Sequence, residues 1–295
     1  MRIETWLAEN TESLSGKTVV MTGDTGGLGA ALCRYLADLG AYLILLDRNV
    51  KASEALRSDL FGEEKDARSE RHTVDFSDLS SVRRVASELS GRKIDLVLLA
   101  AGAYRIPRKR NALGLDNVFQ INFLSAYYLM KELLPALRKS AGKAVIVGSI
   151  AYAIAPVHPL DPDYEHVKNG EKVYGNSKRY LMSSCTELFR NEKDVRLSVT
   201  HPGISPTNIT GHYPKALKKL IRVPMKLLFP DPKKACLPIL KGVFTETLPY
   251  EWIGPSVLSV WGSPKKSRYK KITQDEARFI FRYAEEAAEN MRREA

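Results

Sequence analysis

Short apolar runs alternate with longer amphipathic stretches along most of this chain of 295 residues. A run of β-branched and aliphatic residues predicts a buried strand, whereas apolar residues at helical spacing predict an amphipathic helix. This alternation favours an α/β fold built on a parallel sheet. Strands are predicted over residues 17–22, 42–46, 72–74, 95–99, 144–147 and 196–200. Helices are predicted over residues 30–39, 51–60, 79–89, 114–137 and 173–189, with Pro135 kinking or ending the fourth.

A glycine-rich turn joins the first predicted strand to the first predicted helix. Residues 22–29 read TGDTGGLG, so three residues separate the first two glycines of a Gly-x-x-x-Gly-x-Gly pattern. Glycines there allow a tight turn and let the backbone approach a pyrophosphate, which binds at the N-terminus of the following helix. The pattern therefore predicts a dinucleotide site, and an ordinary glycine-rich turn is the alternative.

A tyrosine and a lysine stand four residues apart in the predicted helix over residues 173–189. They begin and end the run YGNSK at residues 174–178, and Ser149 lies upstream, just after the predicted strand 144–147. Residues four apart share a face of a helix, so Lys178 can stabilise the ionised phenol of Tyr174. That would let Tyr174 act as an acid or base near neutral pH. The alternative is that both residues only serve an amphipathic helix.

Residues 14–210 resemble the short-chain dehydrogenase/reductase family, because the glycine turn, Asn122, Ser149, Tyr174 and Lys178 occur in the family's order. The resemblance implies a Rossmann-type doubly wound parallel sheet with helices on both faces, forming a single domain over residues 1–295. It also implies which residues contact a nicotinamide dinucleotide. These are Thr22, Gly23, Thr25, Gly27, Leu28, Gly29, Asp47, Arg48, Asp75, Phe76, Ala101, Gly102, Tyr174, Lys178, Pro202, Gly203 and Thr207.

The resemblance assigns a role to each of four catalytic residues. Tyr174 would be the acid or base, and Lys178 would favour its ionised form and contact the cofactor ribose. Ser149 would hydrogen-bond the substrate oxygen and hold it near Tyr174. Asn122 would support a water that links the lysine to solvent. The alternative is that both residues are only structural, with Ser149 as a cap at the end of a strand and Asn122 as a polar residue of a helix.

The residues Asp47 and Arg48 bear on the choice of cofactor. A carboxylate at the end of the second strand accepts bonds from the ribose hydroxyls and repels a 2′-phosphate, which favours NAD. Gly26 also favours NAD, because many NADP-using relatives carry a basic residue at that place. Arg48 favours NADP instead, since it could bind the 2′-phosphate. We therefore predict NAD, with NADP as the alternative.

The chain departs from the family pattern in two places. The usual Asn-Asn-Ala-Gly after the fourth strand is Leu-Ala-Ala-Gly at residues 99–102, which puts the local loop geometry in doubt. Ser149 and Tyr174 are separated by a segment rich in proline and charge, over residues 152–172. Similar insertions occur in relatives that resemble retinol and steroid dehydrogenases, so this segment is expected to shape the substrate entrance. Its histidines, His158 and His166, are expected to be solvated rather than catalytic.

Composition limits the remaining classes of function. Hydrophobic residues make up 44% of the chain, which is ordinary for a globular protein. The cysteines Cys33, Cys185 and Cys236 are far apart and suggest neither a disulfide framework nor a metal site, so we predict no bound metal. The N-terminal segment lacks a signal-peptide pattern and no apolar run is long enough to span a bilayer, which predicts a cytoplasmic protein.

The positive charge is concentrated near the C-terminal end. The chain carries a net charge of +11, and residues 206–271 hold thirteen lysines and arginines but three acids. Within this region, residues 213–229 are predicted to form a basic amphipathic helix, part of a substrate lid over residues 205–235. The region could cover a lipid-like or anionic substrate, contact a membrane surface, or simply be solvated. No recognition motif accompanies the charge, so we predict no nucleic-acid binding. A second basic run, residues 105–110, is expected to face the same cleft.

These features together predict an NAD(P)-dependent oxidoreductase that interconverts an alcohol and a ketone or aldehyde of a bulky, hydrophobic substrate. The rival hypothesis is a cofactor-binding sensor or interaction protein with little turnover, motivated by the altered loop over residues 99–102 and by the basic C-terminal half. A polar helix is predicted over residues 273–293, packing on the core or on a second subunit. The resemblance further implies a homo-oligomer that pairs through the fourth and fifth long helices.

Overall fold

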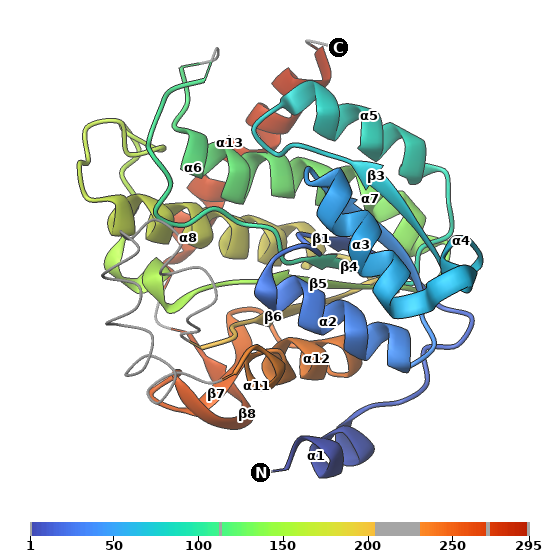
Figure 1. Cartoon of the computed structure of the whole chain (residues 1–295). Coiled ribbons are helices and arrows are strands. Elements are labelled where there is room, and N and C mark those ends of the chain that lie inside the picture. The colour runs from blue at the N-terminus through green and yellow to red at the C-terminus, as the bar shows by residue number, and fades with distance from the viewer. Residues whose placement is uncertain (1, 112–113, 204–230, 270–271, 294–295) are drawn as a thin grey trace, which may run out of the picture.

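The computed structural model describes residues 2–111, 114–203, 231–269 and 272–293, and its centre is an eight-stranded sheet (Figure 1). The strand order is β3-β2-β1-β4-β5-β6-β7-β8. All neighbouring strands run parallel except β7 and β8, which form an antiparallel hairpin at one edge. The strands are β1 (Thr18–Thr22), β2 (Tyr42–Asp47), β3 (Ser69–Thr73), β4 (Leu96–Leu99), β5 (Lys143–Val147), β6 (Arg196–Thr200), β7 (Glu251–Val257) and β8 (Trp261–Arg268).

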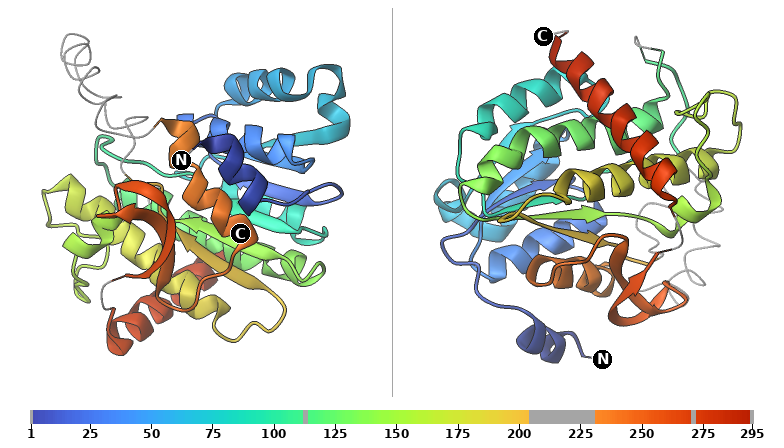
Figure 2. Two further views of the ribbon diagram at one scale, coloured as in Figure 1. Left: turned by 90° about the horizontal axis from the view of Figure 1, so that it is seen from below. Right: turned by 180° about the vertical axis from the view of Figure 1, so that it is seen from behind.

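Helices cover both faces of the sheet (Figures 1 and 2). One apolar core lies under α5, α7, α8 and α13, and a second lies under α2, α3 and α12. The α-helices are α1 (Ile3–Asn10), α2 (Gly27–Asp38), α3 (Val50–Phe61), α4 (Lys65–Arg68), α5 (Leu79–Ser90), α6 (Asn117–Phe119), α7 (Ser125–Arg138), α8 (Gly170–Phe189), α11 (Pro232–Ala235), α12 (Leu237–Phe244) and α13 (Gln274–Arg293). The short elements are the 3-10 helices η1 (Gly62–Glu64) and η3 (Ile150–Ile154) and the π-helical segment η2 (Gln120–Leu124).

The predicted doubly wound α/β architecture is confirmed, with one correction to the prediction of a parallel sheet. Strand β8 is antiparallel, and neither β7 nor β8 was predicted. The apolar residues of β7 are interrupted by Gly254 and Pro255, which usually break strands. Nearly every side chain of β8 is exposed, so this edge strand lacks the apolar run that marks a buried one. The hairpin therefore has no clear signature in the local sequence.

The long helix predicted over residues 114–137 is built from three consecutive pieces. It begins at α6, where the Asp116 carboxylate caps the helix by accepting from the backbone N–H groups of Val118 and Phe119. It passes through the π-helical segment η2 and continues as α7. Pro135 does not end it, because α7 continues to Arg138 with Pro135 in its last turn.

Helix α13 corresponds to the polar C-terminal helix that the sequence predicts, and it packs on this chain's own core. It crosses α8 on the back of the molecule (Figure 2). The Tyr283 ring lies edge-on to the rings of Phe119 and Tyr180, with centroids 6.1 and 5.8 Å away. The Arg179 guanidinium pairs with the Glu276 carboxylate at 3.0 Å. Helix α13 thus covers part of the surface that the resemblance assigns to pairing between subunits.

Candidate active site

A cavity of about 740 Å³ opens at the carboxyl ends of the parallel strands, a volume typical of small-molecule sites. Strand carboxyl ends are where open α/β sheets bind ligands. Thr22 is buried outside the cavity lining, Asn122 and Gly27 also lie outside it, and Thr207 falls outside the described residues. The remaining predicted site residues all line the cavity: Gly23, Thr25, Leu28, Gly29, Asp47, Arg48, Asp75, Phe76, Ala101, Gly102, Ser149, Tyr174, Lys178, Pro202 and Gly203.

The glycines of the turn are required by close backbone contacts. Gly23 has a φ of +76°, and a Cβ atom there would lie 2.8 Å from the Cα atom of Ala101. A Cβ atom on Gly29 would lie 1.9 Å from the carbonyl oxygen of Gly23. The turn therefore folds directly onto the start of α2 and leaves no room for side chains at these two positions. Such a cradle of bare backbone at a helix N-terminus fits a dinucleotide pyrophosphate.

The loop after β4 keeps its place although the family's two asparagines are missing. The Thr22 hydroxyl accepts hydrogen bonds from the backbone N–H groups of Ala100 and Ala101, at 3.1 and 3.0 Å. Thr22 thus ties the end of β1 to the end of β4 from beneath the cavity. Although residues 99–102 lack the family's two asparagines, the loop that they form is still hydrogen-bonded to Thr22, the first residue of the glycine turn.

The Asp47 carboxylate, which ends β2, holds the glycine turn in place. It accepts from the hydroxyl of Thr25 at 2.8 Å and from the Thr25 backbone N–H at 3.3 Å. Its other oxygen accepts from the Asn49 backbone N–H at 2.8 Å. An ionised carboxylate offers about four acceptor positions, so these three bonds leave about one for a ligand. Arg48, the next residue, is exposed.

A second acid lies in the turn, and its role was not predicted. Asp24 is fully buried, and neither carboxylate oxygen has a hydrogen-bond partner among the described residues. Burial raises the pKa of Asp24 to about 6, and the nearby Asp47 carboxylate adds to that rise. The local sequence around Asp24 does not predict that the residue is buried, because its burial depends on how α2 and α3 pack.

Helix α8 brings Tyr174 close to the segment that carries Ser149. A Cβ atom on Gly175 would lie 2.1 Å from the carbonyl oxygen of Ala151, so glycine lets η3 pack directly on α8. Burial raises the pKa of the Tyr174 hydroxyl to about 12, and the Ser149 hydroxyl lowers it by hydrogen bonding. The ring of Tyr104 lies 4.8 Å from that of Tyr174, edge-on, and also raises this pKa. Tyr104 was not predicted as a site residue.

Lys178 is buried beneath the cavity, where its ammonium donates to the backbone carbonyl of Val147 at 2.9 Å. Burial lowers the pKa of Lys178 to about 8. Its nitrogen lies 5.9 Å from the centroid of the Tyr174 ring. The stabilisation of a Tyr174 phenolate by Lys178 therefore stays a prediction, since the group that lowers the pKa of Tyr174 in this structure is Ser149.

Asn122 lies in the π-helical segment η2 and joins two elements of the site. Its side-chain N–H₂ donates to the Ala103 carbonyl at 2.8 Å and to the Ser177 hydroxyl at 3.1 Å. Its side-chain oxygen accepts from the Ala103 backbone N–H at 2.6 Å. Asn122 thus fixes the loop after β4 against α8, next to Lys178. π-Helical insertions of this kind are frequent at functional sites.

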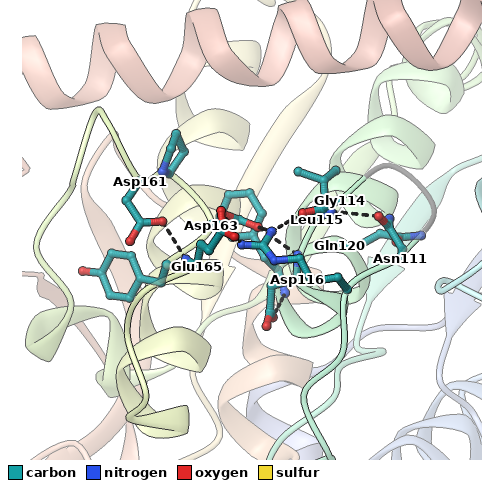
Figure 3. Close-up of polar contacts among 12 residues, drawn as sticks. Asn111, Gly114, Leu115, Asp116, Gln120, Asp161, Asp163 and Glu165 are labelled. Atoms are coloured by element: carbon teal, nitrogen blue, oxygen red, sulfur yellow. Dashed lines mark hydrogen bonds and ion pairs between the residues drawn. The ribbon is translucent and has the colours of Figure 1, made fainter.

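The basic side chains of the run at residues 105–110 do not line the cleft within the described residues, which corrects that expectation, although Ile106 of the run does. Its arginines pair with acids instead: Arg108 with Asp116 at 2.7 Å, and Arg110 with Asp163 at 2.7 Å. Figure 3 shows Asp161, Asp163 and Glu165 of the insertion lying opposite Asn111, Gly114 and Asp116. The insertion over residues 152–172 is therefore fastened to the loop after β4. His158 and His166 are exposed, in agreement with the prediction for them.

His201 is a further buried residue of the cavity wall that was not predicted. It precedes Pro202 and Gly203, and its ring stacks on Trp252 with centroids 5.0 Å apart. Its Nε2 atom bonds the Ser259 carbonyl at 2.9 Å. Burial lowers the pKa of His201 to about 4, so the ring is neutral at physiological pH. The only feature of the sequence that could have indicated His201 as a site residue is its position directly before Pro202 and Gly203.

These features define a doubly wound α/β protein with one cavity lined by a tyrosine, a serine and a lysine beside a glycine turn. The chain belongs to the short-chain dehydrogenase family of oxidoreductases, whose family model matches residues 17–218. Within the described residues, no cluster of three or more potential metal ligands occurs, and no helix is long and apolar enough to cross a membrane.

Two curated relatives and one solved structure illustrate the similarity. The chain is 30% identical over 229 residues to the short chain dehydrogenase resG of Aspergillus sclerotiorum, covering 66% of this chain and 64% of that protein. It is 28% identical over 206 residues to human retinol dehydrogenase 13, covering 68% of this chain and 62% of that protein. The chain thus spans less than two thirds of the length of either relative. A crystal structure of an uncharacterised protein from Mycobacterium paratuberculosis superposes with a TM-score of 0.77 at 24% identity, covering 96% of this chain and 97% of that one.

Proposed function

We propose that this chain is an oxidoreductase that interconverts an alcohol and a ketone or aldehyde, using a nicotinamide dinucleotide. The observation that carries the proposal is the shared cavity: Ser149, Tyr174 and Lys178 line the same space as the glycine turn. The bare backbone at Gly23 and Gly29 fits a pyrophosphate, which supports a dinucleotide there.

A bound nicotinamide dinucleotide would supply or accept the hydride of the proposed reaction. Tyr174 exchanges a proton with the substrate oxygen, and the Ser149 hydroxyl hydrogen-bonds that oxygen and holds it in place. With its pKa lowered to about 8, Lys178 can release and regain a proton near neutral pH. Asn122 would keep Lys178 and the loop after β4 in register through its bonds to Ala103 and Ser177. That Asn122 supports a water linking Lys178 to solvent remains part of the proposal.

For the cofactor we propose NAD, with NADP as the alternative. The Asp47 carboxylate ends β2 at the cavity and keeps about one acceptor position for a ribose hydroxyl, and its charge would repel a 2′-phosphate. Arg48 also lines the cavity and is the feature that would favour NADP. Parallel titrations of NADH and NADPH, followed by cofactor fluorescence, distinguish the two.

For the substrate we propose a bulky, hydrophobic alcohol or carbonyl compound. The outer part of the cavity carries apolar side chains next to Ser149 and Tyr174, namely Ile106, Ile150 and Ile154. The similarity to a protein named retinol dehydrogenase agrees with such a substrate. The lid over residues 205–235, of which only 231–235 lie in the described residues, and the contact of Thr207 with the cofactor belong to the same proposal.

Several wider expectations also remain proposals. They are a single domain over residues 1–295, a homo-oligomer, and a cytoplasmic location with membrane association as the alternative. The basic helix over residues 213–229, on which the membrane alternative depends, lies outside the described residues. The rival hypothesis of a sensor loses part of its motive, because Thr22 holds the altered loop over residues 99–102 in place.

Dinucleotide fluorescence in the presence of an alcohol panel tests the proposal. We expect NADH binding and substrate-dependent turnover, and we expect Tyr174→Phe to lower turnover by at least about 10²-fold while dinucleotide binding survives. Binding without turnover of any alcohol or carbonyl compound would favour the sensor. Loss of dinucleotide binding in Tyr174→Phe would make that residue structural.

A further inference from the structure

Tyr104 stands beside the proposed catalytic tyrosine although no motif marks it. It lies in the loop after β4, is half-buried, and lines the cavity. Its ring centroid is 4.8 Å from that of Tyr174, and the two planes meet at 68°. Edge-to-face aromatic pairs at this distance are attractive and have a defined geometry. The Tyr104 ring therefore forms a fixed wall next to the Tyr174 ring.

The neighbouring residue holds that wall from outside the cavity. Arg105 has a φ of +54°, a left-handed conformation that is rare for residues other than glycine, asparagine and aspartate. Its guanidinium forms an ion pair with the Glu171 carboxylate and lies over the Tyr104 ring, 5.3 Å from the centroid. The Tyr104 hydroxyl makes a long contact of 3.4 Å with the same carboxylate. Unusual backbone conformations persist where surrounding contacts fix them, and they cluster at functional sites.

The wall is also supported from behind. Asn122 holds both polar backbone groups of Ala103, the residue before Tyr104. On the other side, Ile106 and Val167 pack in one small apolar cluster with Tyr174. The insertion thus packs against the proposed catalytic residue itself. Tyr104 is fixed by contacts on both sides along the chain.

Charge at this rim limits the kind of substrate. Glu171 lines the cavity on α8, three residues before Tyr174, and is about half exposed. Arg105, its partner, is absent from the lining that the described residues form. An anionic substrate would therefore meet a carboxylate at the rim, whereas an apolar group would meet the Tyr104 ring and Ile106.

We propose that Tyr104 is a substrate-positioning residue, which selects substrates carrying an aromatic or long apolar group next to the reacting carbon. The inference rests on the proposed function and deepens it. The Tyr104 ring would contact that group and so orient the substrate oxygen toward Ser149 and Tyr174. Glu171, acting through Arg105, would hold the ring in position.

The test compares three alcohols of increasing apolar size: 2-propanol, 2-decanol and 1-phenylethanol. For Tyr104→Ala we expect a KM about tenfold higher for the two large alcohols, in line with a lost apolar contact in a pocket. The KM value for 2-propanol and the Kd of the dinucleotide should stay within about twofold of wild type, so that the ratio of the KM values for the large alcohols to that for 2-propanol reflects the lost contact alone. Tyr104→Phe should behave like wild type, because it keeps the ring. Glu171→Gln should shift selectivity in the direction of Tyr104→Ala.

The chain supplies a matched control. Tyr250 also bonds a glutamate, Glu187, at 2.6 Å, and Glu187 pairs with Arg190 at 2.6 Å, outside the cavity lining of the described residues. Tyr250→Ala should leave the ratio of KM values for 1-phenylethanol and 2-propanol unchanged. An equal change for all three alcohols in Tyr104→Ala, or loss of dinucleotide binding, would mean that Tyr104 is only structural and would overturn the inference.

The inference and the proposed function fail in different ways. If wild type binds the dinucleotide but oxidises none of the three alcohols and reduces none of the matching ketones, both are overturned. If wild type turns them over and Tyr104→Ala keeps the wild-type selectivity, only the inference is overturned. Should Tyr104→Ala not fold, Tyr104→Leu keeps much of the apolar volume without the aromatic edge. It should raise the KM value for 1-phenylethanol more than the value for 2-decanol, and an equal effect on both would count against the ring.

Discussion

The buried acid of the glycine turn predicts a pH-dependent stability that one substitution should remove. The pKa of Asp24 rises from 3.8 to about 6 on folding, chiefly because the carboxyl is fully buried. Each unit of difference between folded and unfolded pKa is worth about 1.4 kcal/mol. A rise of this size therefore makes ionised Asp24 cost about 3 kcal/mol of the free energy of unfolding.

The sign of the effect follows from which state ionises first. Well below pH 3.8, Asp24 is protonated in both the folded and the unfolded chain, so it has no effect on stability. As the pH rises from 4 toward 6, the unfolded chain releases the proton while the folded chain keeps it, and stability is lost. Well above pH 6 both states are ionised and the loss is complete. Asp24→Asn, which cannot ionise, should escape this loss.

Urea unfolding of wild type and Asp24→Asn at pH 4, 5.5 and 7.5 measures the effect. The difference in free energy of unfolding, variant minus wild type, should increase by about 2.4 kcal/mol between the lowest and highest pH, because a small part of the loss has already occurred at pH 4. All other titrating groups are shared and cancel in this difference. Asp78→Asn is the matched control, because Asp78 caps α5 by accepting from the Ser80 N–H and its hydrogen bonds with Ser80 lower its pKa. For Asp78→Asn, the difference in free energy of unfolding, variant minus wild type, should decrease as the pH rises. A difference for Asp24→Asn that stays flat from pH 4 to 7.5 would refute the reasoning.

Four further changes test separate parts of the site and the fold. Tyr174→Phe should lower kcat about 10²- to 10⁴-fold, the usual contribution of a general acid or base, with dinucleotide affinity retained in fluorescence titrations. Gly29→Ala places a Cβ atom 1.9 Å from the Gly23 oxygen and should abolish dinucleotide binding in the same titration. Asp47→Ala frees Thr25 and removes a negative charge, so the ratio of NADPH to NADH affinity should rise. Tyr283→Ala removes aromatic contacts between α13 and the core and should lower the free energy of unfolding by about 1–2 kcal/mol, measured by urea unfolding.

Most of the sheet and its covering helices could be predicted because their signals are local. The strand at residues 196–200 and the helix at 79–89 match β6 and α5 within one residue, since both depend on short apolar periodicity. Strand β3 begins three residues earlier than predicted, because an edge strand tolerates the polar residues Ser69, Glu70 and Arg71. The hairpin of β7 and β8 depends on pairing between a strand interrupted by Gly254 and Pro255 and a strand that is almost entirely exposed, which periodicity does not reveal.

The residues of the proposed site also fall into two groups: those marked by local sequence motifs, which could be predicted, and those whose importance depends on packing, which could not. The glycine turn and the residues Ser149, Tyr174 and Lys178 form an ordered set of motifs, and the structure brings them into one cavity. Asp24 and Tyr104 were missed because nothing in their immediate sequence distinguishes them. The burial of the first depends on packing between α2 and α3, and the importance of the second depends on its distance from a ring on α8.

The basic run at residues 105–110 shows why charge counted along a chain is a weak guide to a ligand. In sequence it has no acids, and it suggests an anion site. In the structure its arginines meet acids that lie 8 to 66 positions away, at Asp116, Asp163 and Glu171. Two of those acids, Asp116 and Asp163, are buried, and a buried carboxylate is costly without a paired cation. The arginines are therefore needed for the acids that fasten the insertion, and the cavity beside them presents Tyr104, Ile106 and a carboxylate. Near Tyr104, this distribution supports the proposed apolar substrate.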